Sequence, residues 1–590
     1  VEVHLVWPEE RLVPMQRGDR GYYHAVVEGV APGARYYYRL NGAKDRPDPA
    51  SRFQPEGVHG PSQVVDLHSF PWEDRCWFGL PLSEYVVYEL HVGTFTPEGT
   101  FDAIVPRLDE LRDLGVTAVE LMPVAQFPGS RNWGYDGTYP FAVQSSYGGP
   151  AGLQRLVDAC HRRGIAVVLD VVYNHLGPEG NYLAEYAPYF TDRYRTPWGA
   201  AINFDGPHSD EVRRYFVENA LHWLTTYHVD ALRLDAVHAI RDFSASPFLA
   251  ELAAAVRRRA EQINRRLHLI AESDLNDARL VLPPAIGGYG LDGQWSDDFH
   301  HALHALVTGE REGYYQDYGE VAHLAKALRE GYVYTGQRSS YRGRRHGNSP
   351  RLVQAHQFVV CAQNHDQVGN RKLGERLSQL VPFEKLKLAA GALLVAPYVP
   401  LLFMGEEYGE TAPFQYFVSH SDPELIEAVR RGRREEFAAF QWQGDVPDPQ
   451  DEATFLRSKL RHELRHQGNH RVLQEWYRAL LRLRKELPSL RHLSKEHLDV
   501  TSQEEPGAVF VRRWTDEHEA LAVLHFGDRP ATVAPPVPLG RWDKALDSAE
   551  ERWLGPGSSL PALLDAEERV TLEVQPWSFA LYTRRTTSLP

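Results

Sequence analysis

Eight short apolar runs recur through the middle of this 590-residue chain, each ending in polar or acidic residues and most followed by an amphipathic helical pattern. They span Val86–His91, Ala118–Met122, Ala166–Asp170, Ala231–Asp235, Leu267–Glu272, Leu291–Trp295, Phe358–Asn364 and Pro400–Gly405. Strands that alternate with helices pair in parallel, and eight such units close into a (β/α)8 barrel. We therefore predict the α/β class, with a TIM barrel at its centre.

The segment between the second and third runs supports this fold. Apolar residues recur there at helical spacing on one face, namely Leu153, Leu156, Val157 and Cys160. Gly164 follows and is expected to end the helix just before the next strand. The pattern predicts a helix that packs its apolar face against the barrel.

Short alternating β-like runs flank the barrel on both sides, punctuated by Pro-Gly and Asn-Gly turn signals. We predict an N-terminal β-sandwich at residues 1–75, a barrel with inserted loops and helices at 76–487, and a C-terminal β-sandwich domain at 488–590. Two long insertions carry basic runs, Arg342–His346 and Arg430–Arg434, which we interpret as solvated surfaces.

Charge and cysteine content exclude several classes of protein. The chain has 64 Lys and Arg residues against 79 Asp and Glu residues, a net charge of −15, which argues against nucleic acid as a partner. No run of about 18 uncharged apolar residues is present, so we predict no membrane partner. The three cysteines are too few for a disulfide framework, and the chain as given starts without a secretory signal. We expect a cytoplasmic location.

Polar residues gather at the ends of the predicted strands. They include Asp170, Asn174, His175, Arg233, Asp235, Glu272, His365 and Asp366. The C-terminal ends of barrel strands share one face of the barrel, so these side chains are expected to converge although they are far apart in sequence. Any one acid could be a helix cap or a solvated group, but the coincidence of three acids with an arginine and two histidines favours an active site.

Clustered carboxylates have a defined chemical use. Because Asp235, Glu272 and Asp366 repel one another, at least one is expected to hold a proton near neutral pH. A protonated acid beside an ionised carboxylate can cleave a glycosidic bond, because the acid protonates the leaving oxygen and the carboxylate attacks the anomeric carbon or stabilises its positive charge. Arg233 lies two residues before Asp235 on the same strand, so it points to the same side and is expected to keep Asp235 ionised.

Aromatic residues of the predicted loops provide candidate surfaces for sugar rings. They are Trp133, Tyr135, Tyr139, Trp198 and Trp295. Each is equally compatible with packing in the core.

Four strings that contain these polar residues resemble, in order, the four short conserved regions of the α-amylase family of glycoside hydrolases. They are Asp170–His175, Ala231–His238, Ile270–Ser273 and Gln363–Asp366. The resemblance implies that Asp235 is the nucleophile, Glu272 the general acid/base, and Asp366 a stabiliser of the transition state. It also implies that the α-configuration is retained at the cleaved bond, and that Tyr135, His175, Arg233 and His365 line the subsite on the non-reducing side of the cut.

Other strings separate subgroups of this family. Residues 181–205 are similar to both glycogen branching enzymes and maltooligosyltrehalose trehalohydrolases, whereas Trp133–Asp136, Gln294–His301 and Phe403–Gly409 favour the trehalohydrolases. Such enzymes cleave the α-1,4 bond between a malto-oligosaccharide and a terminal trehalose unit. The resemblance therefore implies maltooligosyltrehalose and malto-oligosaccharides as binding partners, and trehalose as the product.

By the same resemblance, further residues are expected to contact the substrate. They are Leu234, Ala236, Val237, His238, Asp297, Asp298, Phe299, His300, His301, Gln367, Val368, Gly369 and Asn370. Some amylases bind Ca²⁺ near the asparagine of the first region, but Asn174 alone does not make a cage of about six to eight oxygen ligands. We predict no metal and no cofactor.

Three functions stay open at this point. The leading one is a retaining hydrolase that releases trehalose. The second is a transferase that converts α-1,4 to α-1,6 links, which differs only in whether a sugar hydroxyl or water resolves the intermediate. The third is a non-catalytic glycan-binding protein, which the complete set of acids disfavours.

Overall fold

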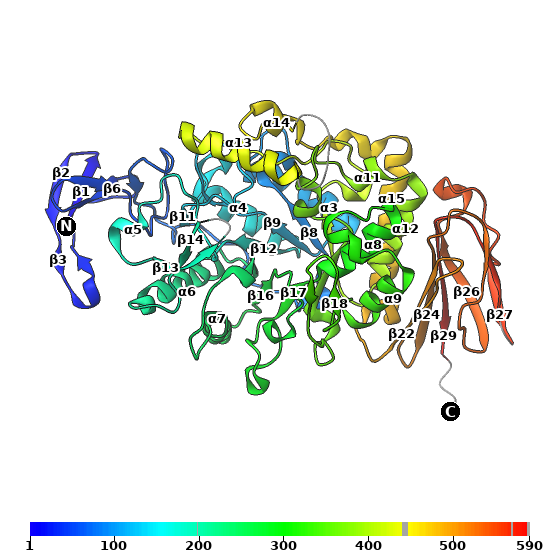
Figure 1. Ribbon diagram of the computed structural model, residues 1–590. Coiled ribbons are helices and arrows are strands. Elements are labelled where there is room, and N and C mark those ends of the chain that lie inside the picture. The colour runs from blue at the N-terminus through cyan, green and yellow to red at the C-terminus, as the bar shows by residue number, and fades with distance from the viewer. Residues whose placement is uncertain (197–198, 439–445, 568–569, 587–590) are drawn as a thin grey trace.

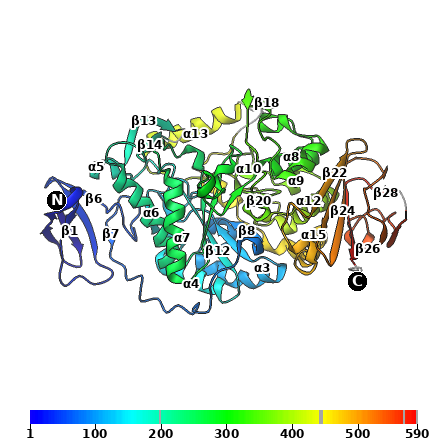
Figure 2. The same ribbon diagram turned by 90° about the horizontal axis from the view of Figure 1, so that it is seen from below.

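The computed structural model describes residues 1–196, 199–438, 446–567 and 570–586. Figure 1 shows a central barrel domain with a β-domain at each end, the N-terminal one in blue and the C-terminal one in orange and red. Figure 2 gives the same arrangement from below, so the two β-domains lie on opposite sides of the barrel.

All eight predicted barrel strands form, and they close in the order β12-β15-β16-β17-β20-β21-β8-β9. Their bounds are β8 (Val87–Leu90), β9 (Ala118–Leu121), β12 (Ala166–Val171), β15 (Ala231–Leu234), β16 (His268–Ala271), β17 (Gly293–Trp295), β20 (Phe358–Cys361) and β21 (Val399–Phe403). The runs that end in Asp235, Glu272 and Asn364 extend past their strands. These polar residues therefore lie in the loops at the C-terminal mouth of the barrel.

The interior of the barrel has two layers, because successive side chains of a strand point alternately inward and outward. The lower layer is apolar and includes Val87, Ala118, Val168, Ala231 and Ile270. Two residues further along, the inward positions are polar, namely Glu89, Glu120, Asp170 and Arg233 within the strands and Glu272 directly after β16. The packed lower layer thus forms the floor of a charged upper layer.

Helices cover the outside of the barrel. The principal ones are α3 (Leu108–Leu114), α4 (Gly149–His161), α6 (Ser209–Thr226), α7 (Phe248–Ile263), α8 (Asp297–Thr308), α9 (Val321–Glu330), α12 (Phe383–Val395) and α15 (Gly468–Glu486). The four apolar residues predicted for the inner face of α4 are all buried. Gly164 follows α4 with a φ of +74°, a conformation that favours glycine and reverses the chain into β12.

The N-terminal β-domain contains a five-stranded sheet and a two-stranded ribbon. The sheet is made of β2 (Arg11–Pro14), β1 (Glu2–Trp7), β5 (Arg35–Leu40), β6 (Lys44–Arg46) and β7 (Ser62–Gln63), and the ribbon of β3 (Gln16–Arg17) and β4 (Tyr23–His24). Arg46 Nε lies 2.9 Å from Glu185 Oε1 in α5 (Leu183–Tyr186), which ties this sheet to a segment inserted after β12.

The C-terminal β-domain has two facing layers, as expected of a sandwich. One is a six-stranded sheet of β22 (Leu498–Gln503), β23 (Ala508–Trp514), β24 (His518–His525), β29 (Ser578–Arg585), β26 (Gly540–Asp547) and β27 (Leu563–Ala566), and the other pairs β25 (Ala531–Val533) with β28 (Leu572–Val574). Phe510 and Trp542 of the first layer share a buried core with Val533 and Leu572 of the second. The proposed boundaries at residues 75 and 487 stay predictions.

Two buried arginines meet at the end of α12, and one of them, Arg513, fastens the C-terminal domain to the barrel, whereas Arg484 belongs to the barrel helix α15. Arg484 donates to the carbonyl oxygens of Leu394 and Ala396 at the end of α12, at 2.7 and 2.8 Å. Arg513 of β23 reaches the same place and donates to Ala396 O at 3.2 Å and Val395 O at 3.0 Å. The guanidinium groups thereby satisfy carbonyl groups that the helix end leaves without partners.

None of the helices within the described ranges combines the length and apolar character needed to cross a lipid bilayer. The cysteines are free thiols, with Cys76 exposed and Cys160 and Cys361 buried.

A buried histidine closes the opposite, N-terminal end of the barrel. His161, at the end of α4, is fully buried, with Nδ1 at 2.8 Å from Asp74 Oδ2 and Nε2 at 2.8 Å from Asp230 Oδ2. Trp77 stacks on the imidazole at 4.9 Å between ring centroids and donates to Asp230 Oδ1. Burial alone would lower the pKa of His161, but the two carboxylates outweigh burial and raise it.

This network predicts a pH-dependent stability. Because the folded-state pKa of His161 is raised above its unfolded value of about 6.5, its ionic contribution is full below about pH 6.5 and is lost as the pH rises through the folded pKa. His161→Gln should lower the free energy of unfolding by about 1–3 kcal/mol at pH 6, since it removes one of the two cations that pair with each of Asp74 and Asp230 while His228 and Arg265 remain, and by less at pH 9. Denaturant unfolding at both pH values measures this, with the exposed His24→Gln as the control. An equal loss at both pH values would contradict the assignment.

Candidate active site

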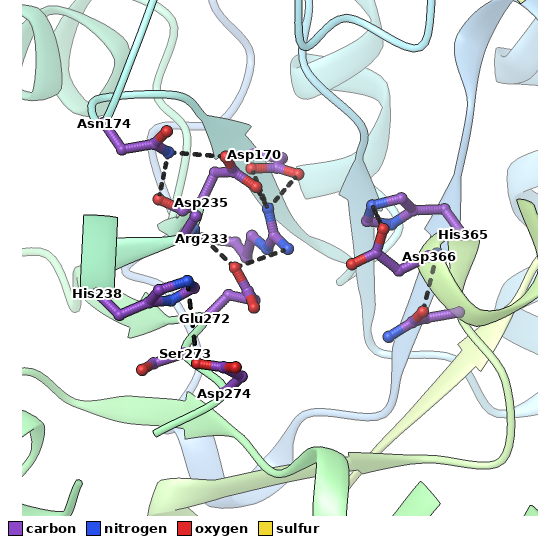
Figure 3. Close-up of polar contacts among 12 residues, drawn as sticks. Asp170, Asn174, Arg233, Asp235, His238, Glu272, Ser273, Asp274, His365 and Asp366 are labelled. Atoms are coloured by element: carbon purple, nitrogen blue, oxygen red, sulfur yellow. Dashed lines mark hydrogen bonds and ion pairs between the residues drawn. The ribbon is translucent and has the colours of Figure 1, made fainter. Parts of the chain in front are cut away.

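Arg233 lies at the centre of the charged layer and contacts three carboxylates. Its Nη1 is 2.9 Å from Asp170 Oδ2 and 2.7 Å from Asp235 Oδ1, and its Nη2 is 3.7 Å from Glu272 Oε2. Figure 3 shows these side chains converging from neighbouring strands. Arg233 is completely buried, and its guanidinium also lies 4.4 Å from the ring centroid of Trp295. The predicted convergence at the barrel mouth is therefore observed for this group.

Asp235 is the first residue after β15 and is held by the amide of Asn174. That amide nitrogen donates to both the carbonyl and the Oδ2 of Asp235, each at 2.8 Å. Burial would raise the pKa of Asp235, but Arg233, His175 and the Asn174 amide outweigh it and hold the pKa below the ordinary value. Asp235 is therefore ionised at neutral pH.

Glu272 follows β16 and has the opposite electrostatic environment. Its Oε2 accepts a hydrogen bond of 2.6 Å from the backbone N–H of Ala236, which has a φ of +40°. Burial raises the pKa of Glu272 well above its ordinary value, and Asp235, Asp297 and Asp366 act in the same direction against the charge of Arg233. Glu272 is therefore held in the protonated form beside an ionised Asp235.

Asp366 faces this pair from the other side of the mouth, as Figure 3 shows. It lies in the short helix α10 (His365–Gly369), whose N-cap residue Asn364 accepts from the Asp366 backbone N–H at 2.9 Å. The Nδ2 of Asn370 donates to Asp366 Oδ1 at 3.0 Å. Its side chain is 46% exposed, compared with 13% for Asp235 and 12% for Glu272, so Asp366 is the most accessible of the three acids.

A hydrogen-bonded chain connects the two sides of the mouth beneath the acids. His365 Nδ1 is 2.5 Å from Glu89 Oε1, and the Tyr135 hydroxyl lies 2.8 Å from His365 Nε2 and 2.6 Å from Asp170 Oδ2. Burial would lower the pKa of His365, but Glu89 outweighs it and raises the pKa to about 9. Burial raises the pKa of Asp170 to about 6, against the effect of Arg233.

Several residues of this site were absent from the predicted site set. Glu89 and Glu120 lie within the apolar runs of β8 and β9. The one feature of the sequence that could have identified them is that each is a single acid within an otherwise apolar strand. Burial raises the pKa of Glu120 well above its ordinary value, with Glu89 and Asp170 adding to the effect. Arg342, expected to be solvated, instead pairs with Asp274 at 2.9 Å, and burial of Asp274 is outweighed so that its pKa is lowered.

Some of the predicted contact residues do gather around the acids. Tyr135 and His365 stack at 5.3 Å between ring centroids, and His175 Nε2 is 3.0 Å from the carbonyl oxygen of Tyr135. Asp297 faces the cluster, where burial together with Asp366 and Asp274 raises its pKa to about 7. His238 lies 3.9 Å from Asp274, beside Glu272 in Figure 3.

Other predicted contacts do not present free side chains to the cluster. The side chains of Leu234, Val237, Phe299 and Val368 belong to the hydrophobic core. Asp298 is buried and accepts from the backbone N–H groups of Val333 and Tyr334 at 2.6 and 2.9 Å, and it anchors that loop instead. The helical and strand periods turn these side chains away from the mouth, and their contact with the substrate stays a prediction.

The remaining predicted contacts are mixed. His300 is buried, with Nδ1 at 2.8 Å from Ala362 O and Nε2 at 2.9 Å from the Tyr315 hydroxyl, so both ring nitrogens already have protein partners. His301 lies one helical turn from Asp297 and packs against Tyr314 at 4.7 Å between ring centroids. Ala236 directly follows Asp235, Gln367 and Gly369 lie in α10 with Asp366, and Asn370 follows that helix.

The aromatic residues that were candidate surfaces for sugar rings also differ in their surroundings. Tyr139 is buried and donates to the carbonyl oxygens of Val58 and Gly180, so it is a structural residue. Trp133 stacks on Phe414 at 5.1 Å between ring centroids. Trp198 lies outside the described residues.

Within the described ranges no three or more His, Cys, Asp or Glu side chains are grouped so that they could hold a metal ion. The absence of a metal stays a prediction.

The arrangement provides a specific chemical capability. An ionised carboxylate and a protonated one share a single arginine, and a third, more exposed acid lies opposite. Environments that push the pKa values of two neighbouring carboxyl groups apart assign one as the base or nucleophile and the other as the acid. This is the equipment for acid-assisted displacement at an acetal carbon.

Known proteins support this conclusion. The sequence profile described as "Alpha amylase, catalytic domain" matches residues 62–198. The malto-oligosyltrehalose trehalohydrolase of Arthrobacter ramosus is 50% identical over 88% of this chain and 93% of its own length. A glucan branching enzyme of Pseudoalteromonas atlantica is 28% identical over 68% of this chain and 58% of its own. A solved structure titled as a putative alpha amylase from Salmonella typhimurium superposes with a TM-score of 0.87 at 38% identity, covering 99% of this chain and 95% of that one.

The active site is therefore that of a glycosidase, as the four motifs had indicated, and the flanking β-domains and closed barrel agree with that assignment. The chain belongs to the malto-oligosyltrehalose trehalohydrolases, within the α-amylase family of glycoside hydrolases.

Proposed function

We propose that this glycosidase cleaves the α-1,4 bond between a malto-oligosaccharide and a terminal trehalose unit, releases trehalose, and retains the α-configuration. The proposal is supported by the names of the trehalohydrolase relatives and by the environments of Asp235 and Glu272. The observation that carries the chemistry is that Arg233 contacts both carboxylates while only Asp235 has its pKa lowered.

In the first step, Asp235 attacks the anomeric carbon of the glucose on the non-reducing side of the bond. A bond forms between the Asp235 carboxylate and that carbon, and the bond to the glycosidic oxygen breaks. Glu272 gives its proton to the departing oxygen, so trehalose leaves as a neutral sugar. The malto-oligosaccharide is then esterified to Asp235.

In the second step, Glu272 is a carboxylate and takes a proton from water. The water oxygen bonds to the anomeric carbon, and Asp235 leaves with the electrons of the ester bond. Two displacements on opposite faces restore the α-configuration. Asp366 is proposed to hold sugar hydroxyls and to stabilise the positive charge that develops in each transition state.

The reaction is proposed to take place in the cytoplasm. The support for this location is the free state of Cys76, Cys160 and Cys361, which is typical of proteins from reducing compartments.

Product analysis tests the proposed substrate. Incubation with maltotriosyltrehalose should give maltotriose and free trehalose, detected by chromatography. Formation of α-1,6 branches from a malto-oligosaccharide without free trehalose would instead support the branching transferase. No product of either kind from the intact protein would support the non-catalytic alternative.

Glu272→Gln should lower kcat by about 10²-fold or more, because the amide cannot protonate the leaving oxygen, and should leave the affinity for the oligosaccharide largely intact. Steady-state kinetics and binding calorimetry measure the two quantities. Glu517→Gln, at the exposed connection between β23 and β24, is the control for the same substitution far from the site. Unchanged turnover would mean that Glu272 is not the acid.

Asp297→Asn tests the electrostatic origin of the Glu272 pKa. The negative charge of Asp297 helps to raise that pKa, so its removal should lower it. Since Glu272 must be protonated for the first step, activity falls as the pH rises through its pKa. The alkaline limb of the kcat/KM profile should therefore move to lower pH in the variant. A limb that stays in place would show that Asp297 does not act on the general acid.

A further inference from the structure

The basic run at Arg430–Arg434 lies in α13 (Pro423–Ala438), within the long connection between β21 and α15. Its members differ in their surroundings. Arg430 pairs with Asp448 at 2.7 Å, and Arg431 is exposed. Arg433 is only partly exposed and reaches the end of α10, the helix that carries Asp366. The interpretation of this run as a solvated surface is therefore wrong for Arg433.

Arg433 contacts two successive residues at the end of α10. Its Nη2 donates to the carbonyl oxygen of Gly369 at 3.1 Å, and its Nη1 donates to Asn370 Oδ1 at 3.2 Å. The other end of the same amide, Asn370 Nδ2, donates to Asp366 Oδ1 at 3.0 Å. A chain of two hydrogen bonds thus runs from the inserted helix to the third carboxylate.

These two hydrogen bonds can form in only one orientation of the Asn370 side-chain amide. A guanidinium has only donors, so it selects the oxygen of the Asn370 amide and turns the NH₂ group away from itself. The NH₂ group then faces Asp366, which needs donors because its oxygens only accept when it is ionised. With the amide reversed, the Asn370 oxygen would face a carboxylate oxygen. Arg433 and the Asp366 carboxylate therefore favour the same orientation of the amide, and Arg433 fixes its oxygen end.

The surroundings restrict movement of the same segment. The Arg433 guanidinium lies 4.8 Å from the ring centroid of Tyr416, and Tyr416 packs edge-on against Trp133 at 5.2 Å. A Cβ atom at Gly369 would lie 2.0 Å from the Trp133 ring, so the chain there passes directly over the indole. Gly369 and Asn370 are therefore confined between Arg433 and Trp133.

We propose that Arg433 is a positioning residue for the third carboxylate, acting through the Asn370 amide from a helix that lies outside the (β/α)8 core. This inference rests on the proposed role of Asp366. Asp366 is the most exposed of the three acids, and besides His365 Nε2 at 3.9 Å the Asn370 amide, at 3.0 Å, is the group that orients its carboxylate.

A double-mutant cycle tests the proposal. Arg433→Gln and Asn370→Ala should each lower kcat/KM for maltotriosyltrehalose by about tenfold, with most of the loss in kcat, because Asp366 is proposed to act in the transition state. The double variant should be no slower than Asn370→Ala within about twofold, because the proposal places the effect of Arg433 in the orientation of that amide and not in its contact with the Gly369 carbonyl oxygen. The alkaline limb of the pH profile should not move.

Two further variants separate positioning from general stability. Arg431→Gln, an exposed neighbour on the same helix, should leave kcat/KM unchanged. Arg433→Lys should recover only part of the loss, since an ammonium is a point charge that does not fork to two acceptors. Thermal unfolding midpoints show whether any variant is simply less folded.

The outcomes are distinct. Multiplicative losses in the double variant, or full activity in Arg433→Gln, would overturn the positioning role while leaving the proposed function in place. A wild-type protein that releases no trehalose would overturn the proposed function itself. In that case the same cycle, measured with whichever oligosaccharide the protein cleaves, still decides whether Arg433 acts through Asn370.

Discussion

The buried ionic contacts of Arg233 are the interaction on which the site depends. Three carboxylates, Asp170, Asp235 and Glu272, lie around one guanidinium that has no exposure to solvent. Without that charge, burial would favour the protonated form of all three acids, and none would be available as a nucleophile. With it, the closest contact at 2.7 Å keeps Asp235 ionised, whereas Glu272 at 3.7 Å keeps its proton.

The barrel makes this arrangement possible through the alternation of its strands. Inward positions lower in the lumen are filled by apolar side chains, and the positions two residues higher carry charges. The packed floor excludes water from beneath the charges, which strengthens each electrostatic contact. Asp235 and Glu272 directly follow β15 and β16, so they lie at the mouth, where they can reach a substrate. A step of two residues along each strand therefore separates the apolar layer, which stabilises the fold, from the charged layer, which supports the chemistry.

The strands and the acids were predictable because local patterns determine them. Apolar runs of strand length ending in acids gave all eight barrel strands, and the shared face of the strand ends placed Asp235, Glu272 and Asp366 around one mouth. Glu89 and Glu120 were missed because a single acid inside an apolar run contradicts the pattern used to find the strand. Only the closed barrel shows that these positions point at the site.

The predicted substrate contacts stay predictions, but the structure shows which of these side chains face the mouth and which pack in the core. The resemblance implied substrate contacts for runs of consecutive residues. A helix turns about 100° per residue, so consecutive side chains face different surroundings. Asp297 faces the mouth, whereas Phe299, on the other side of α8, packs in the core. The contact of Arg433 with Asn370 could not be predicted, because the two residues are 63 positions apart and no local sequence pattern links them.

Identification of the covalent intermediate tests the central claim most directly. Glu272→Gln protein can be mixed with α-maltosyl fluoride, whose fluoride leaves without needing a proton, and then digested for mass spectrometry. The account predicts a mass increment of one maltosyl unit on the peptide that contains Asp235, because the attack step is preserved and the hydrolysis step is slowed. An increment on a different carboxylate, or rapid release of fluoride with no adduct on any peptide, would contradict it.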